Sequence, residues 1–579
     1  MAIMNAARPC RGRAPDSVPD TPPPGGEGFF RVLAGKSRIF RRQLGSISED
    51  EVHWNDPGPG RHPLSAAAPT RRRNLAPIRP GHRRALGWLA AALLMIGAAP
   101  PPVTGSESPA AERAQLDAEF ADQLAHLADW AEAQGLASEA QQTRDWLLPT
   151  YQDKQIVYRI ADGQPSAAAS ADAAEWQRRF RSLRELRADA LFVLVKPAAE
   201  QEQVSLAFEL LYATLRENPE HEAARRLLGH KQYQDRWYAP NTLRRIEQGE
   251  VWHERFGWLP ADHVARYEQG ERRYGTRWIT AEREAELRRS IARGWHIETE
   301  HFDVTTNHSL EEGVALARRL EQLHAAWFQV FAAFHTTPKQ LQQLIRYGKP
   351  SRRPPARHKV VYFATRDEYV NELVRRQPGI ERSLGVYFAN RRTAYFFAGE
   401  DQDPGTVLHE ATHQLFQETA SLKQPAGQKR HAWVVEGIAC YMESLRDGQR
   451  SPWGGFDTVG GYHVARLPGA RIRLLEDRFY IPFAELTRMG LWQLNRHPQA
   501  ATVYTQIAGQ ATFLMHYSDG HYRDALVQYL RAVYGDRASP AELAELAEES
   551  FGELDLAYRQ FLLAAEADAE ARAKSGDSR

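Results

Sequence analysis

The sequence predicts an α+β protein in which a domain of a small mixed sheet and helices follows an α-helical, partly repeat-containing region. Three observations indicate this class. Residues 107–230 are rich in Ala, Leu, Glu and Arg, with apolar residues three and four apart. Residues 231–295 contain a short repeat marked by tryptophan. From residue 296 onward, strand-like segments alternate with amphipathic helical ones.

The composition excludes several classes of protein. The chain has 579 residues and 42% hydrophobic content, enough for two or more cores. Its 74 basic and 73 acidic residues nearly cancel, so the charge balance indicates no nucleic-acid partner. The two cysteines, Cys10 and Cys440, are too few for a disulfide framework or a cysteine-based zinc site. Any metal must therefore be held by histidines and carboxylates.

The N-terminal residues 1–84 differ in composition from the rest. They include "TPPPGGEG" and "PTRRRNLAPIRPGHRR", rich in Pro, Gly and Arg. Such a segment cannot bury enough apolar surface to offset its ordering entropy, so we expect it to be disordered.

Residues 85–106 predict export. A basic pair precedes an uninterrupted apolar run over 85–99, which Pro100 closes. The run is short for a membrane span but has the length of a signal-peptide core. It also lies far from Met1, which leaves two alternatives open: a cleaved signal peptide, or a signal-anchor that tethers the protein to the membrane. Both predict a periplasmic, envelope or secreted protein.

The helical region contains two clear helical patterns. "AERAQLDAEFADQLAHLADWAEAQG" repeats apolar residues at helical spacing and ends at Gly135, a suitable helix C-terminus. "SLAFELLYATLRENPEHEAARRLLG" predicts a helical hairpin that turns at Asn218-Pro219.

Three tryptophans mark the repeat that follows. Trp237, Trp258 and Trp278 lie about twenty residues apart, each expected to open a short helix. They either fill the cores of small stacked units or form an aromatic surface for glycans or peptides. We favour core residues, because burial is the commoner use of tryptophan.

The patterns from residue 296 predict alternating strands and helices. We expect strands at "IETEHFDVTT" and "KVVYFAT", and helices at "LEEGVALARRLEQLHAAWFQVFAAF" and "RDEYVNELVRR". "LGVYFA" and "TAYFFAG" predict a hairpin that turns at residues 390–392. We expect "TAYFFAG" to be the edge strand on which an extended peptide pairs. The helices "YRDALVQYLRAVYG" and "PAELAELAEESFG" complete the domain, and residues 566–579 are predicted to be a disordered tail.

The stretch "LHEATHQ" carries the pattern H-E-x-x-H at His409, Glu410 and His413. It lies on a helix that is predicted to open at Asp403-Pro404, where an N-cap residue precedes proline. Residues four apart on a helix share a face, so the two histidines can bind one metal ion. Glu410 projects beside that face, where it can take a proton from the attacking water.

A further ligand is available in "WVVEGIACYMESL". Glu436 follows His413 by 23 residues on a second predicted helix, and Gly437 beside it permits close helix packing. Glu443, two turns later, is placed to hydrogen-bond a ligand imidazole. Cys440 faces the site but is interpreted as a small buried apolar residue, not as a ligand.

"HEATHQL" followed by "WVVEGIACYME" resembles the gluzincin metallopeptidases, and residues 296–565 resemble the peptidase-MA-like domains of bacterial exported proteins. The resemblance implies a zincin-like metallopeptidase domain in which His409, His413 and Glu436 bind Zn²⁺ and Glu410 is the general base. Clan aminopeptidases carry a G-x-M-E-N type stretch before the motif. It has no counterpart here, which argues against strict aminopeptidase activity.

Members of the clan often stabilise the oxyanion with a Tyr or His from the C-terminal helices. The candidates here are Tyr462, His463, Tyr504 and His516. We favour Tyr504, because it opens an apolar helix whose small residues allow packing near the metal-binding helices.

The sequence thus predicts an exported zinc-dependent peptidase that acts on a peptide or protein substrate. Two alternatives stay open. One is a catalytically silent, zinc-stabilised binding protein of the envelope. The other is an interaction module, formed by the helical and tryptophan-repeat regions, to which the zinc domain is accessory.

Overall fold

The α+β class is confirmed by the computed structural model, which describes residues 108–161, 167–348, 356–400, 402–420, 422 and 424–575. The predicted disordered segment 1–84 and the predicted export segment 85–106 lie outside the described residues. None of the helices in the described ranges is long and apolar enough to cross a membrane.

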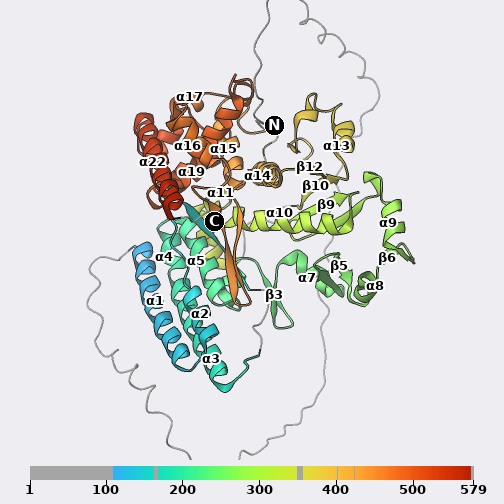
Figure 1. Ribbon diagram of the computed structural model, residues 1–579, viewed down its shortest axis with the longest axis vertical. Helices are drawn as coiled ribbons and strands as arrows, with labels where there is room; N and C mark the ends of the chain where they lie inside the picture. The colour runs from blue at the N-terminus through green and yellow to red at the C-terminus, as the bar shows by residue number, and fades with distance from the viewer. Residues whose placement is uncertain are drawn as a thin grey trace, which may run out of the picture. The chain divides into compact units, whose positions relative to one another are not determined.

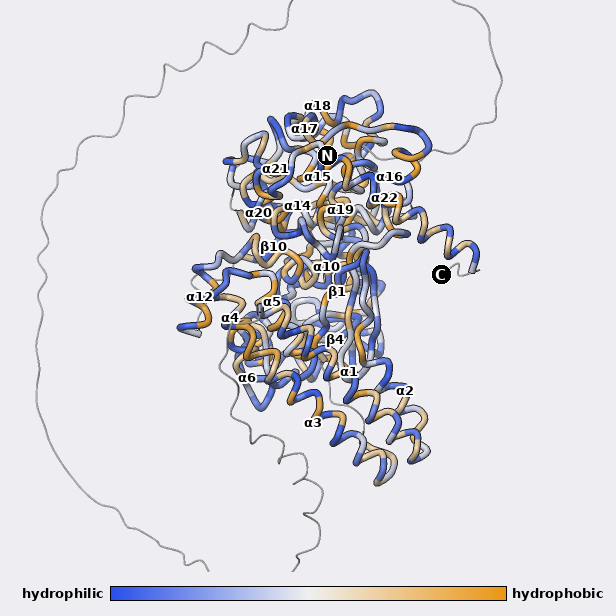
Figure 2. The backbone as a smooth tube through the Cα atoms, turned by 90° about the vertical axis from the view of Figure 1, so that its left-hand side faces the viewer, coloured by the Kyte–Doolittle hydropathy of each residue, from blue (hydrophilic) through white to orange (hydrophobic). Residues whose placement is uncertain are grey.

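Helices dominate the segment that was predicted to be helical, as Figure 1 shows. The first begins at Pro109, and the Ser108 side chain caps it by accepting a hydrogen bond from the Ala111 N–H. Hydrophobic and hydrophilic residues alternate along the third helix, α3 (Ala171–Val193), in Figure 2. This pattern is expected for a helix with one buried face. The elements are α1 (Pro109–Ala133), α2 (Ala137–Asp145), β1 (Lys154–Arg159), α3 (Ala171–Val193), α4 (Val195–Glu200), α5 (Val204–Glu217) and α6 (Glu222–Leu227).

The tryptophan repeat folds as three units, each a two-stranded hairpin followed by a short helix. Each tryptophan lies in the second strand of its hairpin and not at the start of a helix, which corrects the prediction. All three tryptophans are only half-buried, so they are not full core residues. The units are β2 (Lys231–Tyr233), β3 (Arg236–Tyr238) and α7 (Pro240–Glu247); β4 (Glu250–His253), β5 (Gly257–Pro260), η1 (Ala261–His263) and α8 (Val264–Glu268); and β6 (Glu271–Tyr274), β7 (Arg277–Thr280) and α9 (Ala281–Leu287).

A five-stranded sheet of order β11-β12-β10-β9-β8 follows the short η2 (Ile291–Arg293). Its strands are β8 (Trp295–Glu298), β9 (Phe302–Thr306), β10 (His358–Phe363), β11 (Val386–Phe388) and β12 (Thr393–Phe397). Strands β9, β10 and β12 are parallel, whereas the outer strands β8 and β11 run antiparallel to their neighbours.

The sheet order corrects the prediction about the edge strand. The hairpin of "LGVYFA" and "TAYFFAG" is present as β11 and β12, but β12 lies between β10 and β11. All five residues of β12 are buried. A strand that is paired on both sides cannot accept an added peptide strand, so β12 cannot bind a peptide in this way. The outer strand at this end of the sheet is β11.

The segment "IETEHFDVTT" forms two strands where one was predicted. β8 ends at Glu298 and β9 begins at Phe302, and the Thr299 N–H donates to the Phe302 carbonyl (2.9 Å) across the turn. Glu321 on α10 (Leu310–Val330) holds this turn, because its carboxylate accepts hydrogen bonds from the Thr299 hydroxyl (2.6 Å) and the His301 N–H (2.7 Å). Alternation alone does not reveal such a turn.

A three-stranded sheet joins the N-terminal and C-terminal parts of the chain. Its order is β1-β14-β13, with β13 (Arg446–Ser451) and β14 (Gly454–Gly460). The antiparallel pairing runs from Lys154 opposite Gly460 to Arg159 opposite Gly455. The region predicted as a helical domain therefore supplies a strand to the region predicted as the peptidase domain. The boundaries at residues 230 and 295, as limits of separately folding units, stay a prediction.

Among the other helices, α16, α17, α19 and α22 pack near one another at the upper left of Figure 1. The last of them extends to Ser575, into the segment that was predicted to be a disordered tail from residue 566. Ion pairs one turn apart, between Asp568 and Arg572 and between Glu570 and Lys574, favour this extension. The helices are α11 (Ala332–His335), α12 (Pro338–Tyr347), α13 (Arg366–Leu373), η3 (Ile380–Arg382), α14 (Pro404–Ala420), α15 (Ala432–Met442), α16 (Leu467–Leu475), α17 (Phe483–Leu486), α18 (Leu491–Asn495), α19 (Ala500–Gly520), α20 (Arg523–Val533), α21 (Glu542–Ala547) and α22 (Phe551–Ser575).

Candidate metal centre

Helices α14 and α15 carry the candidate ligands. As predicted, α14 begins at Pro404, and the Asp403 carboxylate accepts a hydrogen bond from the Gly405 N–H (3.1 Å). All residues of α15 are buried, and it packs on α14 and α19. A Cβ atom on Gly437 would lie 2.7 Å from the Ile507 carbonyl oxygen of α19, so glycine is required for this close approach.

The structure brings His409, His413 and Glu436 together. The Nε2 atoms of the two histidines are 3.1 Å apart. The Glu436 Oε2 atom lies 3.4 Å from the Nε2 of His409 and 3.5 Å from that of His413. Ligand atoms about 2.1 Å from a tetrahedral zinc ion are roughly 3.3 Å apart, so this triangle fits such an ion. The three side chains are buried or nearly so, which shields the cluster from bulk water.

Glu443 orients the first imidazole, as predicted. Its Oε1 atom lies 2.9 Å from the Nδ1 of His409, which leaves the Nε2 atom directed at the cluster. Burial opposes ionisation of Glu443, but hydrogen bonding to His409 and the charge of Arg466 hold its pKa below the ordinary value. The carboxylate therefore stays ionised.

Arg466 is the residue of this network that the sequence analysis missed. Its Nε and Nη2 atoms donate to the two oxygens of Glu443, at 2.9 and 2.7 Å. This bidentate pair fixes the plane of the carboxylate, and through it the ring of His409. Arg466 follows Glu443 by 23 residues and belongs to no motif, so only the tertiary structure identifies it.

Glu410 lies on the sheet side of α14. Its Oε2 atom accepts a hydrogen bond from the Tyr387 N–H of β11 (2.9 Å). Its Oε1 atom is buried and accepts no hydrogen bond from any residue in the described ranges. A buried carboxylate oxygen without a donor is costly in a purely structural role, whereas a group that must accept a proton requires a free oxygen.

Of the four oxyanion candidates, Tyr504 is the one placed beside a predicted ligand. It lies on α19 and donates its hydroxyl proton to the Asn495 side chain (2.8 Å). Burial and the negative charge of Glu436 raise the pKa of Tyr504 well above its ordinary value, so the phenol keeps its proton.

The other three candidates have partners elsewhere. His516 lies 3.0 Å from the Tyr441 hydroxyl, and His463 pairs with Asp568 (2.6 Å). The ring of Tyr462 packs against Phe561. In the described part of the chain, none of these contacts joins the three residues to His409, His413 or Glu436.

Cys440 lies beside the cluster without completing it. Its Sγ atom is 3.8 Å from the Nδ1 of His409, a nitrogen that Glu443 already contacts at a shorter distance. Burial raises the pKa of the Cys440 thiol. A neutral thiol is a poor metal ligand, which agrees with the interpretation of this residue as a small buried side chain.

The fold and the cluster together define an α+β protein with a buried His–His–Glu group that could hold a metal ion. Residues 403–537 match a family model described as a protein of unknown function, DUF1570. The matched segment begins at the N-cap of α14 and includes α15 and α19, so it contains the whole cluster and Tyr504. No curated protein matches the chain.

Arg466 provides a test of how the cluster is oriented. If the cluster holds a metal ion, replacing Arg466 with Met should weaken its affinity for added Zn²⁺ by about 10- to 100-fold, because Glu443 loses the partner that fixes it against His409. Arg473→Met is the matched control, since the guanidinium of Arg473 forms an ion pair with Asp477 at the surface, away from Glu443. Competition with a chelator measures both affinities. Equal zinc affinity in the two variants would contradict the role given to Arg466.

Proposed function

We propose that the chain is a zinc-dependent peptidase of gluzincin type. The observation that supports this most is the pairing of the His409–His413–Glu436 triangle with an adjacent carboxylate, Glu410, that keeps one oxygen free of hydrogen bonds. The resemblance of both helices to gluzincin motifs points in the same direction. The proposal that the protein is exported rests on the apolar run at residues 85–99 alone.

The proposed chemistry assigns separate tasks to the side chains. His409, His413 and Glu436 would hold Zn²⁺, which when bound polarises the scissile carbonyl and makes water more acidic. Glu410 takes the proton of the attacking water on its free oxygen and delivers it to the leaving amine. The Tyr387 N–H holds the other oxygen and so fixes the direction of the carboxylate.

Tyr504 is the proposed oxyanion donor. Because its pKa is raised, the hydroxyl remains a donor throughout the neutral range. In the structure this hydroxyl is bound to Asn495, so donation to a substrate requires it to exchange that partner. Asn495 is therefore the hydrogen-bond acceptor of the Tyr504 hydroxyl when no substrate is bound.

The test is a peptide-library digestion by the purified full chain, with and without a chelator. Cleavage should disappear when the metal is removed and return when Zn²⁺ is added back, because a ligand set of this kind holds the ion reversibly. Stoichiometric zinc binding with no cleavage of any peptide would favour the silent binding protein instead. Cleavage that persists without metal would exclude the proposed mechanism.

A further inference from the structure

Glu418 lies eight residues after Glu410 on α14 and contacts side chains from the five-stranded sheet. Its side chain is 3% exposed, and its Oε2 atom lies 3.0 Å from both the Nδ1 of His358 on β10 and the Nη2 of Arg392. Its Oε1 atom accepts a hydrogen bond from the Tyr387 hydroxyl of β11 (3.4 Å). The carboxylate therefore holds β10, β11 and the turn before β12 against the helix that carries two of the candidate ligands.

Tyr387 contacts α14 at two points. Its backbone N–H donates to the Glu410 Oε2 atom (2.9 Å), whereas its hydroxyl donates to Glu418. Eight residues of an α-helix span about 12 Å, so Tyr387 lies along α14 and is held at both ends. Because β11 is the outer strand of the sheet, this N–H is available to leave the sheet and bond Glu410. A shift of β11 relative to α14 would therefore move the donor that directs Glu410.

The turn between β11 and β12 is fixed to the same carboxylate. Arg392 in this turn has a φ of 52°, in the left-handed region that favours glycine. Its guanidinium pairs with Glu418, and its carbonyl accepts a hydrogen bond from the Gln414 side chain (3.4 Å). A strained residue persists only where its surroundings hold it in place. The contacts of Arg392 with α14 thus help to fix the position of Tyr387 over Glu410.

The contacts of Glu418 require a carboxylate. Tyr387, Arg392 and Gln414 all donate to it, so both of its oxygens act as acceptors. Burial opposes ionisation of Glu418, but the hydrogen bond and the charge of His358 hold its pKa below the ordinary value. Glutamine has only one acceptor oxygen, and its amide group would face donors. Glu418→Gln should therefore weaken the attachment of β11 while keeping the size of the side chain.

We propose that Glu418 is a positioning residue for the general base, because through Tyr387 it sets where the β11 N–H meets Glu410. The inference rests on the proposed peptidase function, in which Glu410 needs one oxygen free and correctly directed. The ligand triangle does not include Glu418. Its replacement should therefore change the rate of hydrolysis and not the binding of zinc.

Steady-state kinetics of the full chain test this role. Glu418→Gln should lower kcat by about ten- to a hundredfold with KM and zinc content near those of the parent, because a misdirected base slows only the chemical step. Glu321→Gln is the matched control, since that carboxylate also fixes a strand turn to a helix through a histidine (2.7 Å), but at the β8–β9 turn. It should keep the parent kcat. Equal losses of kcat in the two variants would overturn the assignment.

Tyr387→Phe tests whether Glu418 acts through Tyr387. It removes the hydroxyl, keeps the backbone N–H and leaves the buried charges in place. By itself it should lower kcat by about two- to tenfold, the scale of one hydrogen bond. Combined with Glu418→Gln, it should be about as slow as Glu418→Gln alone, because both changes break the same contact. An unchanged kcat in Tyr387→Phe, or independent losses that multiply in the double variant, would contradict the proposal.

Amide hydrogen exchange separates this inference from the peptidase proposal, because it needs no substrate. Exchange at the Tyr387 N–H should become faster by about tenfold or more in Glu418→Gln and stay unchanged in Glu321→Gln. If the parent cleaves no peptide but Tyr387 responds in this way, the peptidase proposal fails while the positioning of the Glu410 carboxylate by Glu418 stands. Unchanged exchange at Tyr387 in Glu418→Gln would overturn the positioning role whether or not the parent cleaves peptides.

Discussion

Replacing Glu410 with Gln is expected to lower peptide hydrolysis by about a hundredfold or more while leaving the zinc content unchanged. Glutamine keeps the size of the side chain and can still accept the hydrogen bond from the Tyr387 N–H, which is 2.9 Å from the carboxylate. It cannot accept a proton from water. The ligand triangle of His409, His413 and Glu436 does not include Glu410, so metal binding should survive.

Variants of the proposed zinc ligands should differ from Glu410→Gln in their zinc content. His413→Ala and Glu436→Gln each remove a member of the triangle, so both should lose much of the zinc together with the activity. Metal analysis and hydrolysis measured side by side on the three variants distinguish the two kinds of loss. Unchanged hydrolysis in Glu410→Gln would reject the mechanism. Loss of zinc in that variant would mean that Glu410 acts as a ligand.

The sequence predicted those parts of the site that depend on local spacing. The pattern of His409, Glu410 and His413 places two ligands on one helical face, and Asp403 marks where that helix begins. Gly437 indicated a close helix contact, and the structure identifies its partner as Ile507 on α19. Each of these inferences uses residues within a few turns of one another.

The features that the sequence did not reveal depend on contacts between distant segments. Arg466 reaches Glu443 only after α15, β13 and β14 have been arranged. The near-continuous apolar run of β12 is typical of a strand that is buried on both faces, but its pairing with β10 and β11 follows only from the tertiary structure. The pairing of β1 with β14 likewise joins segments that share no motif.

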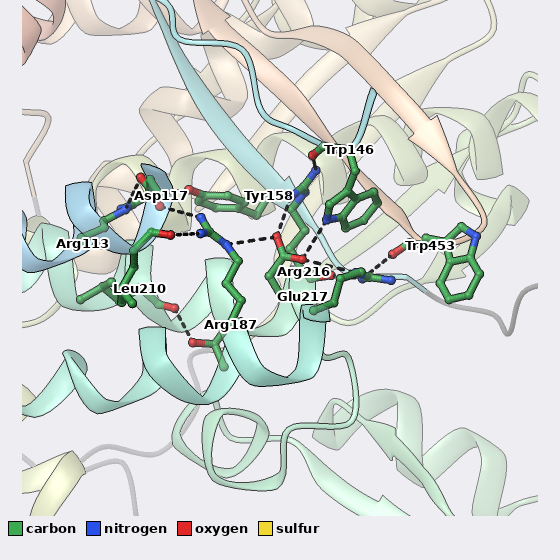
Figure 3. Close-up of polar contacts among 12 residues, drawn as sticks. Arg113, Asp117, Trp146, Tyr158, Arg187, Leu210, Arg216, Glu217 and Trp453 are labelled. Carbon is green, nitrogen blue, oxygen red and sulfur yellow. Dashed lines mark hydrogen bonds and ion pairs between the residues drawn. The ribbon is translucent and has the colours of Figure 1, made fainter. Parts of the chain in front are cut away.

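The second large effect concerns stability: Glu217→Gln is expected to destabilise the fold by about 3–5 kcal/mol. The Glu217 carboxylate is 3% exposed and accepts hydrogen bonds from Arg216 Nη1 (2.7 Å) and Arg184 Nε (3.3 Å). The Trp146 indole N–H donates to it as well (2.8 Å), as Figure 3 shows. Glutamine would leave two buried guanidinium groups without the carboxylate that neutralises them.

The surroundings of Arg184 disfavour its charged form even with Glu217 in place. Burial, together with the charge of Arg216, lowers the pKa of Arg184 to about 10 although Glu217 is present. Its Nη2 atom also donates to the Arg216 and Trp453 carbonyls, at 2.6 and 3.1 Å. Trp453 precedes β14, so this network connects the N-terminal helices to the sheet that contains β1 and β14.

A matched control is available on α3, where Glu175 also pairs with two arginines, Arg178 and Arg179, but at the surface. Glu175→Gln should cost at most about 1 kcal/mol, because exposed ion pairs contribute little. Urea unfolding of the two variants measures the difference.

We expect one cooperative unfolding transition in both variants, since the β1–β14 pairing makes the N-terminal helices and the C-terminal region unfold together. Two separate transitions in Glu217→Gln, with the second at the same urea concentration as in the parent, would contradict this. They would show that residues 107–230 unfold as an independent domain and that the Glu217 network stabilises that domain alone.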